Sequence, residues 1–119
     1  MAHVIFGVKL NIPNDRFVET FTHLVDRRYK KDVEEDPKEF FGDLSVPVKL
    51  IDGYELWQIN NSEDSSTFLV FKRYSLLEDR EWTKIIRPSG LQIHNFEAWV
   101  KDHGINGQWA EYLVLDDRR

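Results

Sequence analysis

Apolar and polar residues alternate near the start of the chain, as they do in a strand with one buried side. The apolar side of this segment carries Val4, Phe6, Val8 and Leu10. We therefore predict a strand over residues 3–11, which Pro13 ends.

A helical period replaces the alternation after Asn14, whose side-chain oxygen suits a helix cap. The apolar positions now recur every three or four residues and are Phe17, Val18, Phe21, Leu24 and Val25. Such a stripe predicts a helix over residues 15–31 that buries one face as far as Val25. His23 falls on the opposite side of this helix.

The middle of the chain predicts one short helical turn and three strands. Asp36 suits a cap, Pro37 suits the first helical position, and Glu39 can reach back, so a turn that ends at Gly42 is expected. Asp52-Gly53 is a typical two-residue hairpin turn between strands. The three predicted strands of this meander are residues 46–51, 54–60 and 67–74.

Residues 75–87 carry two conflicting signals. Ser75 and Glu78 have the spacing of a capping box, whereas residues 82–86 alternate as in a strand. We predict a helical turn that leads into an extended piece.

The clearest element of the second half is a helix over roughly residues 95–103. Its stripe consists of Phe96, Trp99, Val100 and His103. We predict that Asn95 caps its start and that Gly104 takes the left-handed position after its end, with Ile105 as the accompanying hydrophobic contact. A final strand is predicted over residues 109–115.

The order of these elements predicts the α+β class. Runs of strands, without strict alternation of strands and helices, favour a mainly antiparallel sheet. We expect four to five strands with two helices packed on one face, and a ferredoxin-like split βαβ pair with insertions is one version of this arrangement. Since no repeat or linker divides the chain, residues 1–119 are predicted to form one α+β domain.

Composition then excludes several classes of protein. Hydrophobic residues make up 41% of the 119 residues, and there is no cysteine, so disulfide frameworks, thiolate metal sites and cysteine nucleophiles are excluded. No apolar run reaches the roughly 20 residues of a membrane span, and no secretory signal is expected. We expect a cytoplasmic protein without a cofactor.

Charge is mixed along the chain except in one place. Five residues, 27–31, contain four bases and are followed directly by acids, which are Asp32, Glu34, Glu35 and Asp36. The simplest explanation is that the bases occupy the last turn of the predicted first helix, where cations complement the helix dipole, with the acids in the next loop or helix start. A phosphate-facing patch and an acidic docking surface are the alternatives.

Motifs of enzymes are scarce. The glycine spacing permits neither a P-loop nor a dinucleotide fingerprint. His103, with His94 and Glu97 nearby in sequence, could act as a general base or metal ligand in a small enzyme, but a last-turn histidine is also favoured by the helix C-terminus alone. His3 lies near the chain terminus and is not expected to take part.

Nucleic-acid binding is the second hypothesis. Its residues would be Arg27, Arg28, Tyr29, Lys30 and Lys31, joined by Lys72, Arg73 and Tyr74, because bases interleaved with aromatic rings suit single strands. The formal charge of −5 and the acids after the cluster argue against a general affinity for phosphates.

Protein recognition is the function that we predict first. The partner-binding surface would join Glu34, Glu35 and Asp36 to Phe40 and Phe41, because charge speeds encounter and buried aromatic contacts slow release. The expected protein is non-enzymatic and modulates, for example inhibits, another macromolecule. Trp82 and Trp109 are further candidates for exposed aromatic residues, and partly open sheet edges would also permit a homodimer.

Overall fold

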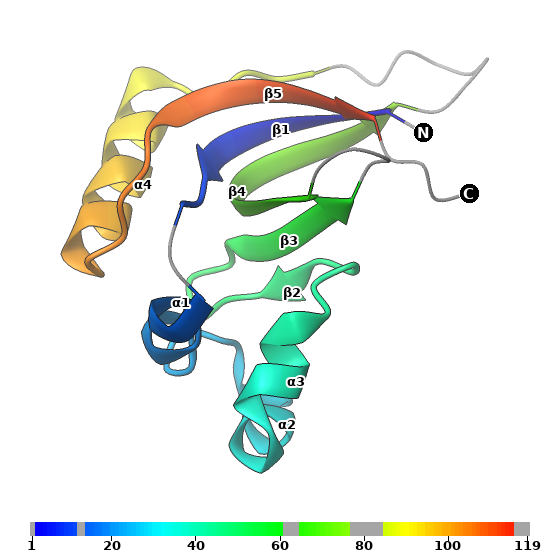
Figure 1. Cartoon of the computed structure of the whole chain (residues 1–119). Coiled ribbons are helices and arrows are strands. Elements are labelled where there is room, and N and C mark those ends of the chain that lie inside the picture. The colour runs from blue at the N-terminus through cyan, green and yellow to red at the C-terminus, as the bar shows by residue number, and fades with distance from the viewer. Residues whose placement is uncertain (1, 12–13, 61–64, 77–84, 116–119) are drawn as a thin grey trace.

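The computed structural model describes residues 2–11, 14–60, 65–76 and 85–115. Five strands form one antiparallel sheet in the order β2-β3-β4-β1-β5 (Figure 1). The predicted α+β class with a mainly antiparallel sheet is therefore confirmed. In chain order the elements are β1 (Ala2–Lys9), α1 (Asn14–Phe21), η1 (Arg27–Tyr29), α2 (Lys30–Glu35), α3 (Pro37–Gly42), β2 (Val48–Lys49), β3 (Glu55–Asn60), β4 (Ser65–Leu76), α4 (Gly90–Asp102) and β5 (Trp109–Leu115).

Without β2, the strand order is the ferredoxin-like one. β1, α1 and β3 form a split βαβ unit with β4 between its strands, and β4, α4 and β5 form a second unit with β1 between. The segment from α1 to β3 adds η1, α2, α3 and β2 to this plan. The chain therefore consists of a βαββαβ frame with one long insertion.

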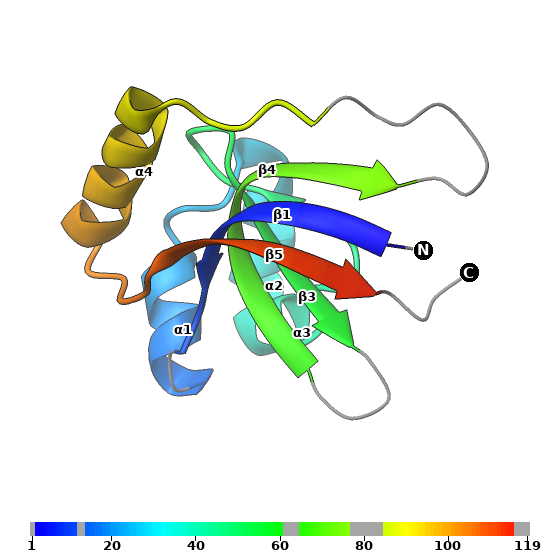
Figure 2. The ribbon, with the colours of Figure 1, turned by 90° about the horizontal axis from the view of Figure 1, so that it is seen from above.

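The helices α1 and α4 pack on the same face of the sheet, as predicted (Figures 1 and 2). Phe21 of α1 and Phe96 of α4 are both fully buried there. Phe96 contacts the rings of Tyr54, Phe71 and Trp109, at centroid distances of 4.8, 5.5 and 5.5 Å. This aromatic cluster ties α4 to β4 and β5.

The opposite face of the sheet is also buried. Its residues are Ile5, Trp57, Ile59, Phe68 and Val70, all at most 3% exposed. The predicted alternation of β1 is confirmed, because Ile5 belongs to this second cluster while Val8 belongs to the first.

Gly7 marks an irregularity in the pairing of β1 with β4, where the register shifts between Phe6 and Gly7. A Cβ atom at Gly7 would lie 2.2 Å from the Leu69 carbonyl oxygen. Only glycine allows the two backbones to approach this closely.

The predicted helix over residues 15–31 is wrong beyond Phe21, where α1 ends. The backbone N–H of Thr22 still donates to the Val18 carbonyl, but Val25 then pairs with Leu50 in an isolated β-bridge. Because this bridge keeps Val25 buried, the apolar stripe is satisfied without continuing the helix.

The predicted hairpin around Asp52-Gly53 is confirmed, with Gly53 at φ +86°, but its turn is longer than two residues: the Leu50 backbone N–H donates to the Tyr54 carbonyl, so the turn comprises residues 51–53. Its first strand is shorter than residues 46–51, because β2 comprises only two residues. The helical turn ending at Gly42 is also confirmed, and the Asp36 carboxylate accepts a hydrogen bond from the Glu39 backbone N–H at 3.2 Å.

The helix α4 begins earlier than predicted, because Ser89 and Gln92 form a capping box and Asn95 lies inside the helix. Its predicted end is confirmed. Gly104 adopts φ +70°, and the backbone N–H of the buried Ile105 donates to the Val100 carbonyl at 3.0 Å, which is the Schellman pattern.

The prediction for residues 75–87 is wrong at its start, because Ser75 belongs to β4. Trp82 and the remaining positions up to residue 84 lie outside the described residues. The Tyr74 hydroxyl donates to the Ile86 carbonyl at 3.1 Å, so the chain after residue 84 returns along β4. Of the helices described, none has the length and apolar character to cross a membrane.

Candidate functional site

The inserted helices form a projection that we call the α2–α3 lobe, residues 26–43. Figure 1 shows it beyond β2, away from α4. The lobe is anchored by Val33 and Phe41, which are 2% and 7% exposed and belong to the main core. Most of its other side chains are solvent-exposed.

The structure brings four of the five predicted partner-binding residues to the surface of this lobe. Glu34, Glu35 and Asp36 are exposed, and Phe40 is half-buried. Phe41 is a core residue, so its predicted role at the surface is wrong: its ring points inward and packs on Phe17 at 5.8 Å. Neighbouring residues on a helix point in different directions, so Phe40 keeps part of its ring exposed while Phe41 is buried in the core. Only the Phe40 ring is therefore available to a partner.

Asp36 also has a structural task. Its carboxylate caps α3, as described above, and anions are favoured at a helix N-terminus. Glu34 and Glu35 have no such task, and they form the part of the acidic cluster that local structure does not explain.

The structure does not place the basic cluster in the last turn of the first helix, which was the simplest explanation of this cluster. Because α1 ends at Phe21, the bases do not lie in its last turn: Arg27 and Arg28 belong to the three-residue η1, and Lys30 and Lys31 open α2. Glu34 and Glu35 end the same helix. Both pairs therefore stand where the helix dipole disfavours them.

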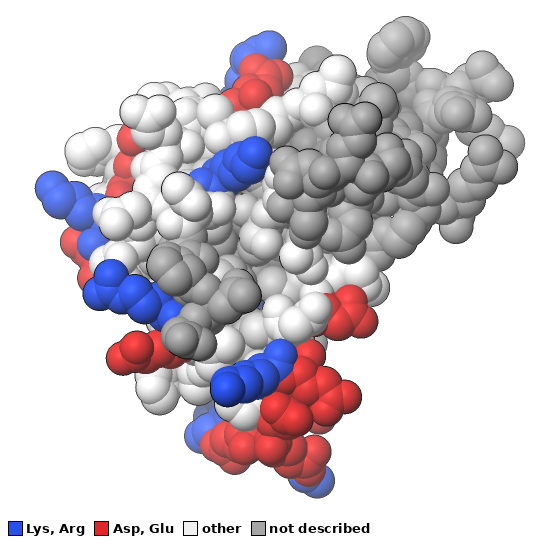
Figure 3. Space-filling view, in the orientation of Figure 1, with Lys and Arg blue, Asp and Glu red and all other residues white. Residues whose placement is uncertain are grey.

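Among the described residues, no ion pair within 4.0 Å involves these four side chains, which are those of Lys30, Lys31, Glu34 and Glu35. The salt bridge of the lobe joins Arg28 to Asp26 at 3.2 Å. The Arg28 backbone N–H, which donates to Asp26, lowers the pKa of that carboxyl below its ordinary value of 3.8, and the Arg28 guanidinium lowers it further. Figure 3 shows the acidic side chains gathered at the lower end of the molecule, with bases at the margin.

An aromatic pair lies within the same lobe. The rings of Tyr29 and Phe40 are 5.6 Å apart, and both residues are half-buried. The Arg28 guanidinium lies 5.8 Å from the centre of the Tyr29 ring. The lobe thus combines charged side chains that form no ion pair among the described residues with a partly exposed aromatic surface.

The residues of the nucleic-acid hypothesis do not converge. Lys72 lies over Tyr74 on the helix side of β4, at 6.0 Å from the ring centre. Arg73 points to the opposite side, where its Nε donates to Glu55 at 2.9 Å. Lys72 and Arg73 therefore do not extend the basic cluster of the lobe into one groove.

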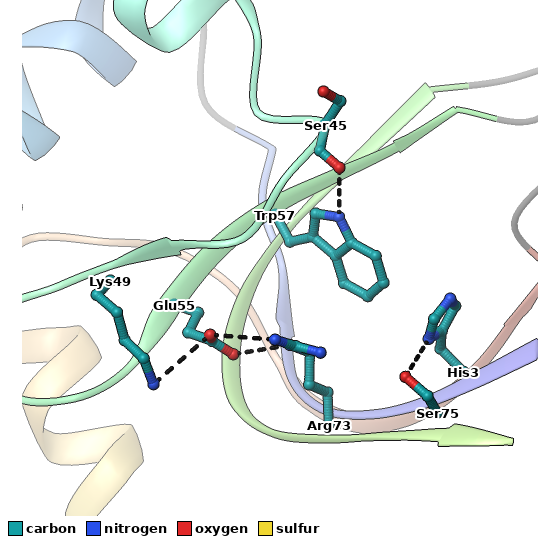
Figure 4. A network of polar contacts seen from close by, with 7 residues as sticks. All are labelled: His3, Ser45, Lys49, Glu55, Trp57, Arg73 and Ser75. Atoms are coloured by element: carbon teal, nitrogen blue, oxygen red, sulfur yellow. Dashed lines mark hydrogen bonds and ion pairs between the residues drawn. The ribbon is translucent and has the colours of Figure 1, made fainter. Parts of the chain in front are cut away.

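A second polar and aromatic cluster, which we did not predict, lies on the face of the sheet opposite α1 and α4 (Figure 4). Arg73 lies 5.5 Å from the Trp57 ring centre, and His3 contacts the same ring edge-on at 4.8 Å. The Trp57 indole N–H donates to the Ser45 carbonyl at 3.0 Å. Glu55 bridges Arg73 and Lys49, whose Nζ is 3.6 Å from the carboxylate.

His3 belongs to this cluster although it lies near the chain terminus. It is 5% exposed, and its Nδ1 lies 3.1 Å from the Ser75 hydroxyl oxygen. Its position two residues before Ile5 on the alternating strand was the available signal, because that side of β1 is buried. Since His3 is packed under Trp57, we assign the cluster to holding β1, β3 and β4 together.

The candidate residues of the enzyme hypothesis are not drawn together either. His103 follows the last residue of α4, its Nδ1 is 2.8 Å from the Trp99 carbonyl oxygen, and its ring contacts the Trp99 ring at a centroid distance of 4.3 Å with a tilt of 40°. His94 and Glu97 are exposed. Within the described part of the chain, no group of three or more His, Cys, Asp or Glu side chains could hold a metal ion.

A depression of about 350 Å³ lies where α4 ends beside β1. Glu97 and Lys101 stand on one side of it, and Val8 and Gly107 on the other. A Cβ atom at Gly107 would meet Val8 Cγ1 at 2.0 Å, so the loop after α4 packs tightly there.

Aromatic exposure was also predicted at Trp109, which is half-buried. Its ring packs against Phe96 and Phe71 and stacks on Phe6 at 6.4 Å, so it completes the core. The lobe therefore carries four charged side chains, Lys30, Lys31, Glu34 and Glu35, that form no ion pair among the described residues, together with the partly exposed rings of Tyr29 and Phe40. No family model, curated protein or solved structure matches the chain.

Proposed function

We propose that this protein is a non-enzymatic binder that modulates another protein through the α2–α3 lobe. The partner would carry a basic patch opposite Glu34 and Glu35 and an apolar contact for Phe40. Net charge at the contact would steer the encounter, and burial of the Phe40 ring would slow dissociation.

The observation that carries this proposal is the charge order of α2. Cations in a first helical turn and anions in a last turn each cost about 0.3–1 kcal/mol relative to the opposite arrangement. Lys30, Lys31, Glu34 and Glu35 all stand in the unfavourable place, and none has a compensating ion pair among the described residues. Local rules are commonly broken at functional sites, where the stability is given up for an interaction outside the chain.

The aromatic surface of the lobe supplies the second support. Interface hot spots combine aromatic rings with surrounding groups that exclude water. Phe40 and Tyr29 are half-buried beside the acids, so they can bury further area without a change of backbone.

The test begins with capture of partners on the immobilised wild-type chain and continues with the purified partner. Association rates are measured at 50 and 500 mM salt for the wild type and for Glu34→Lys with Glu35→Lys. We expect the double variant to associate at least tenfold more slowly at low salt and to lose most of the salt dependence. Phe40→Ala is expected to speed dissociation with little change in the association rate.

The matched control reverses two exposed acids of α4, Glu97→Lys with Asp102→Lys, which change the net charge equally. If the control slows association as much as the lobe variant, the effect is one of net charge and the lobe is not the site. If the captured material absorbs at 260 nm and binds with a steep salt slope that Lys30→Glu with Lys31→Glu removes, nucleic-acid binding replaces this proposal.

A further inference from the structure

The two edges of the sheet differ in how their backbone groups are satisfied. On the β2 side, the Asp26 backbone N–H donates to the Lys49 carbonyl at 3.0 Å, and the Ile51 N–H donates to the Leu24 carbonyl at 2.8 Å. Past the end of β2, the Gln58 N–H donates to the Leu44 carbonyl at 2.8 Å. This edge is therefore closed by the segments that flank and form the lobe.

The β5 edge is different. β5 pairs with β1 on one side, and no described residue makes a backbone hydrogen bond to its other side. The strand is seven residues long and contains neither proline nor lysine, which are common devices that protect an edge. Figure 1 shows it at the margin of the sheet, beside β1.

The side chains of β5 do not protect this edge either. Leu113 is 70% exposed. Glu111 is the one charged residue of the strand, and it forms an ion pair with Arg87. An unprotected, largely apolar edge of this length is typical of a strand that pairs with another chain.

We propose that β5 pairs with β5 of a second copy, antiparallel and around a two-fold axis at Tyr112. Tyr112 is the central residue of the strand, so this register pairs all seven positions. It places Glu111 opposite Leu113 of the second copy, and Ala110 opposite Val114. A two-fold axis at Glu111 would instead set like charges directly opposite each other, which is unfavourable.

The occupant is a second copy because the strand is complementary to itself. An isologous contact needs the same surface on both partners, and here the full-length register covers each exposed Leu113 without opposing its single charge to itself. The result is a continuous sheet through both copies.

The dimer would also change how the lobes act. In each copy the lobe stands beyond β2, at the opposite side of the sheet from β5 (Figure 1). Pairing through β5 therefore leaves both lobes free and presents them at the two far ends, so a partner with two sites would be held bivalently. The dimer itself does not depend on the function proposed for the lobe.

Sedimentation equilibrium over 1–500 µM tests the proposal. We expect the wild type to reach twice the chain mass of 14.2 kDa as concentration rises. Leu113→Glu is expected to weaken the dimer at least tenfold, because it sets two carboxylates opposite each other twice per dimer. Leu113→Lys is expected to keep the dimer, since the same register pairs it with Glu111.

The control is Leu91→Glu, on α4, where the side chain is equally exposed at 70%. Circular dichroism and thermal unfolding establish that each variant is folded, as an exposed position allows. A wild type that stays monomeric throughout, a dimer that Leu113→Glu leaves intact, or equal weakening by Leu113→Lys or Leu91→Glu would each overturn the proposal.

Discussion

The helices α4 and α2 are built on opposite principles. In α4, Ser89 and Gln92 cap the start, Lys101 lies in the last turn, and Gly104 ends the helix in a left-handed conformation. In α2, Tyr29 precedes the helix without a side-chain cap, bases open it and acids end it. Side-chain caps and a left-handed glycine therefore define both ends of α4, whereas α2 has no side-chain cap and is held by the burial of Val33.

This difference separates a frame that is supported by local and tertiary interactions from a lobe that carries charges without ion pairs. The βαββαβ frame is consistent at each level, from caps to core. The α2–α3 lobe relies on tertiary contacts, because a helix of six residues is not stable alone. Lys30, Lys31, Glu34 and Glu35 form no ion pair among the described residues, so these four charges remain available for binding.

The largest effect is expected in the frame, from Phe96→Ala. Phe96 is fully buried among three aromatic rings, so its truncation should lower the free energy of unfolding by about 3–5 kcal/mol. Denaturant unfolding measures this, with Leu91→Ala on the same helix as a control that should change stability by less than about 0.5 kcal/mol. Equal effects of the two variants would contradict the assignment of the core.

A smaller loss of stability is expected at the start of α3, where the lobe follows the usual preference for a helix cap. Asp36→Ala removes the cap of α3 and should cost about 0.5–2 kcal/mol. Asp36→Asn keeps a side-chain oxygen and should lose only a fraction of that, as measured by thermal unfolding. A loss as large as that of Phe96→Ala would mean that lobe and frame do not differ in the way described.

The most direct test of the comparison between α2 and α4 is a pair of variants that should increase stability. Glu34→Gln with Glu35→Gln removes the anions from the last turn of α2 without placing like charges one turn from Lys30 and Lys31, which should raise the free energy of unfolding by about 0.3–1 kcal/mol per residue. Lys30→Gln with Lys31→Gln should do the same at the first turn. Denaturant midpoints at low salt check both, and a loss in either pair would show that the original charges serve the fold.

The smallest effect concerns pH. Burial raises the pKa of the Tyr54 phenol above its ordinary value of 10.0, and the Asp52 carboxylate raises it further. The folded state then holds this proton more tightly than the unfolded state, so the contribution is full below pH 10 and is lost as pH rises through the folded pKa. The free energy of unfolding should fall more between pH 9 and 11.5 in the wild type than in Tyr54→Phe, and parallel curves would refute this.

Local patterns were sufficient for β1, for the position of the hairpin and for the end of α4. Alternation predicted β1, Asp52-Gly53 predicted the turn, and Gly104 with Ile105 predicted the helix end, because each depends on neighbours within a few residues. The acids of the lobe and Phe40 were also predicted as surface from their sequence positions.

Only the tertiary structure decided the rest. Whether Val25 continued a helix or formed a bridge depended on Leu50, which lies far away in sequence. The same long-range contact moved the bases from a helix end to a helix start, and so reversed the meaning of the charge cluster. The inward position of Phe41 and the burial of His3 likewise depend on which surfaces pack together, and one strand or helix by itself does not contain that information.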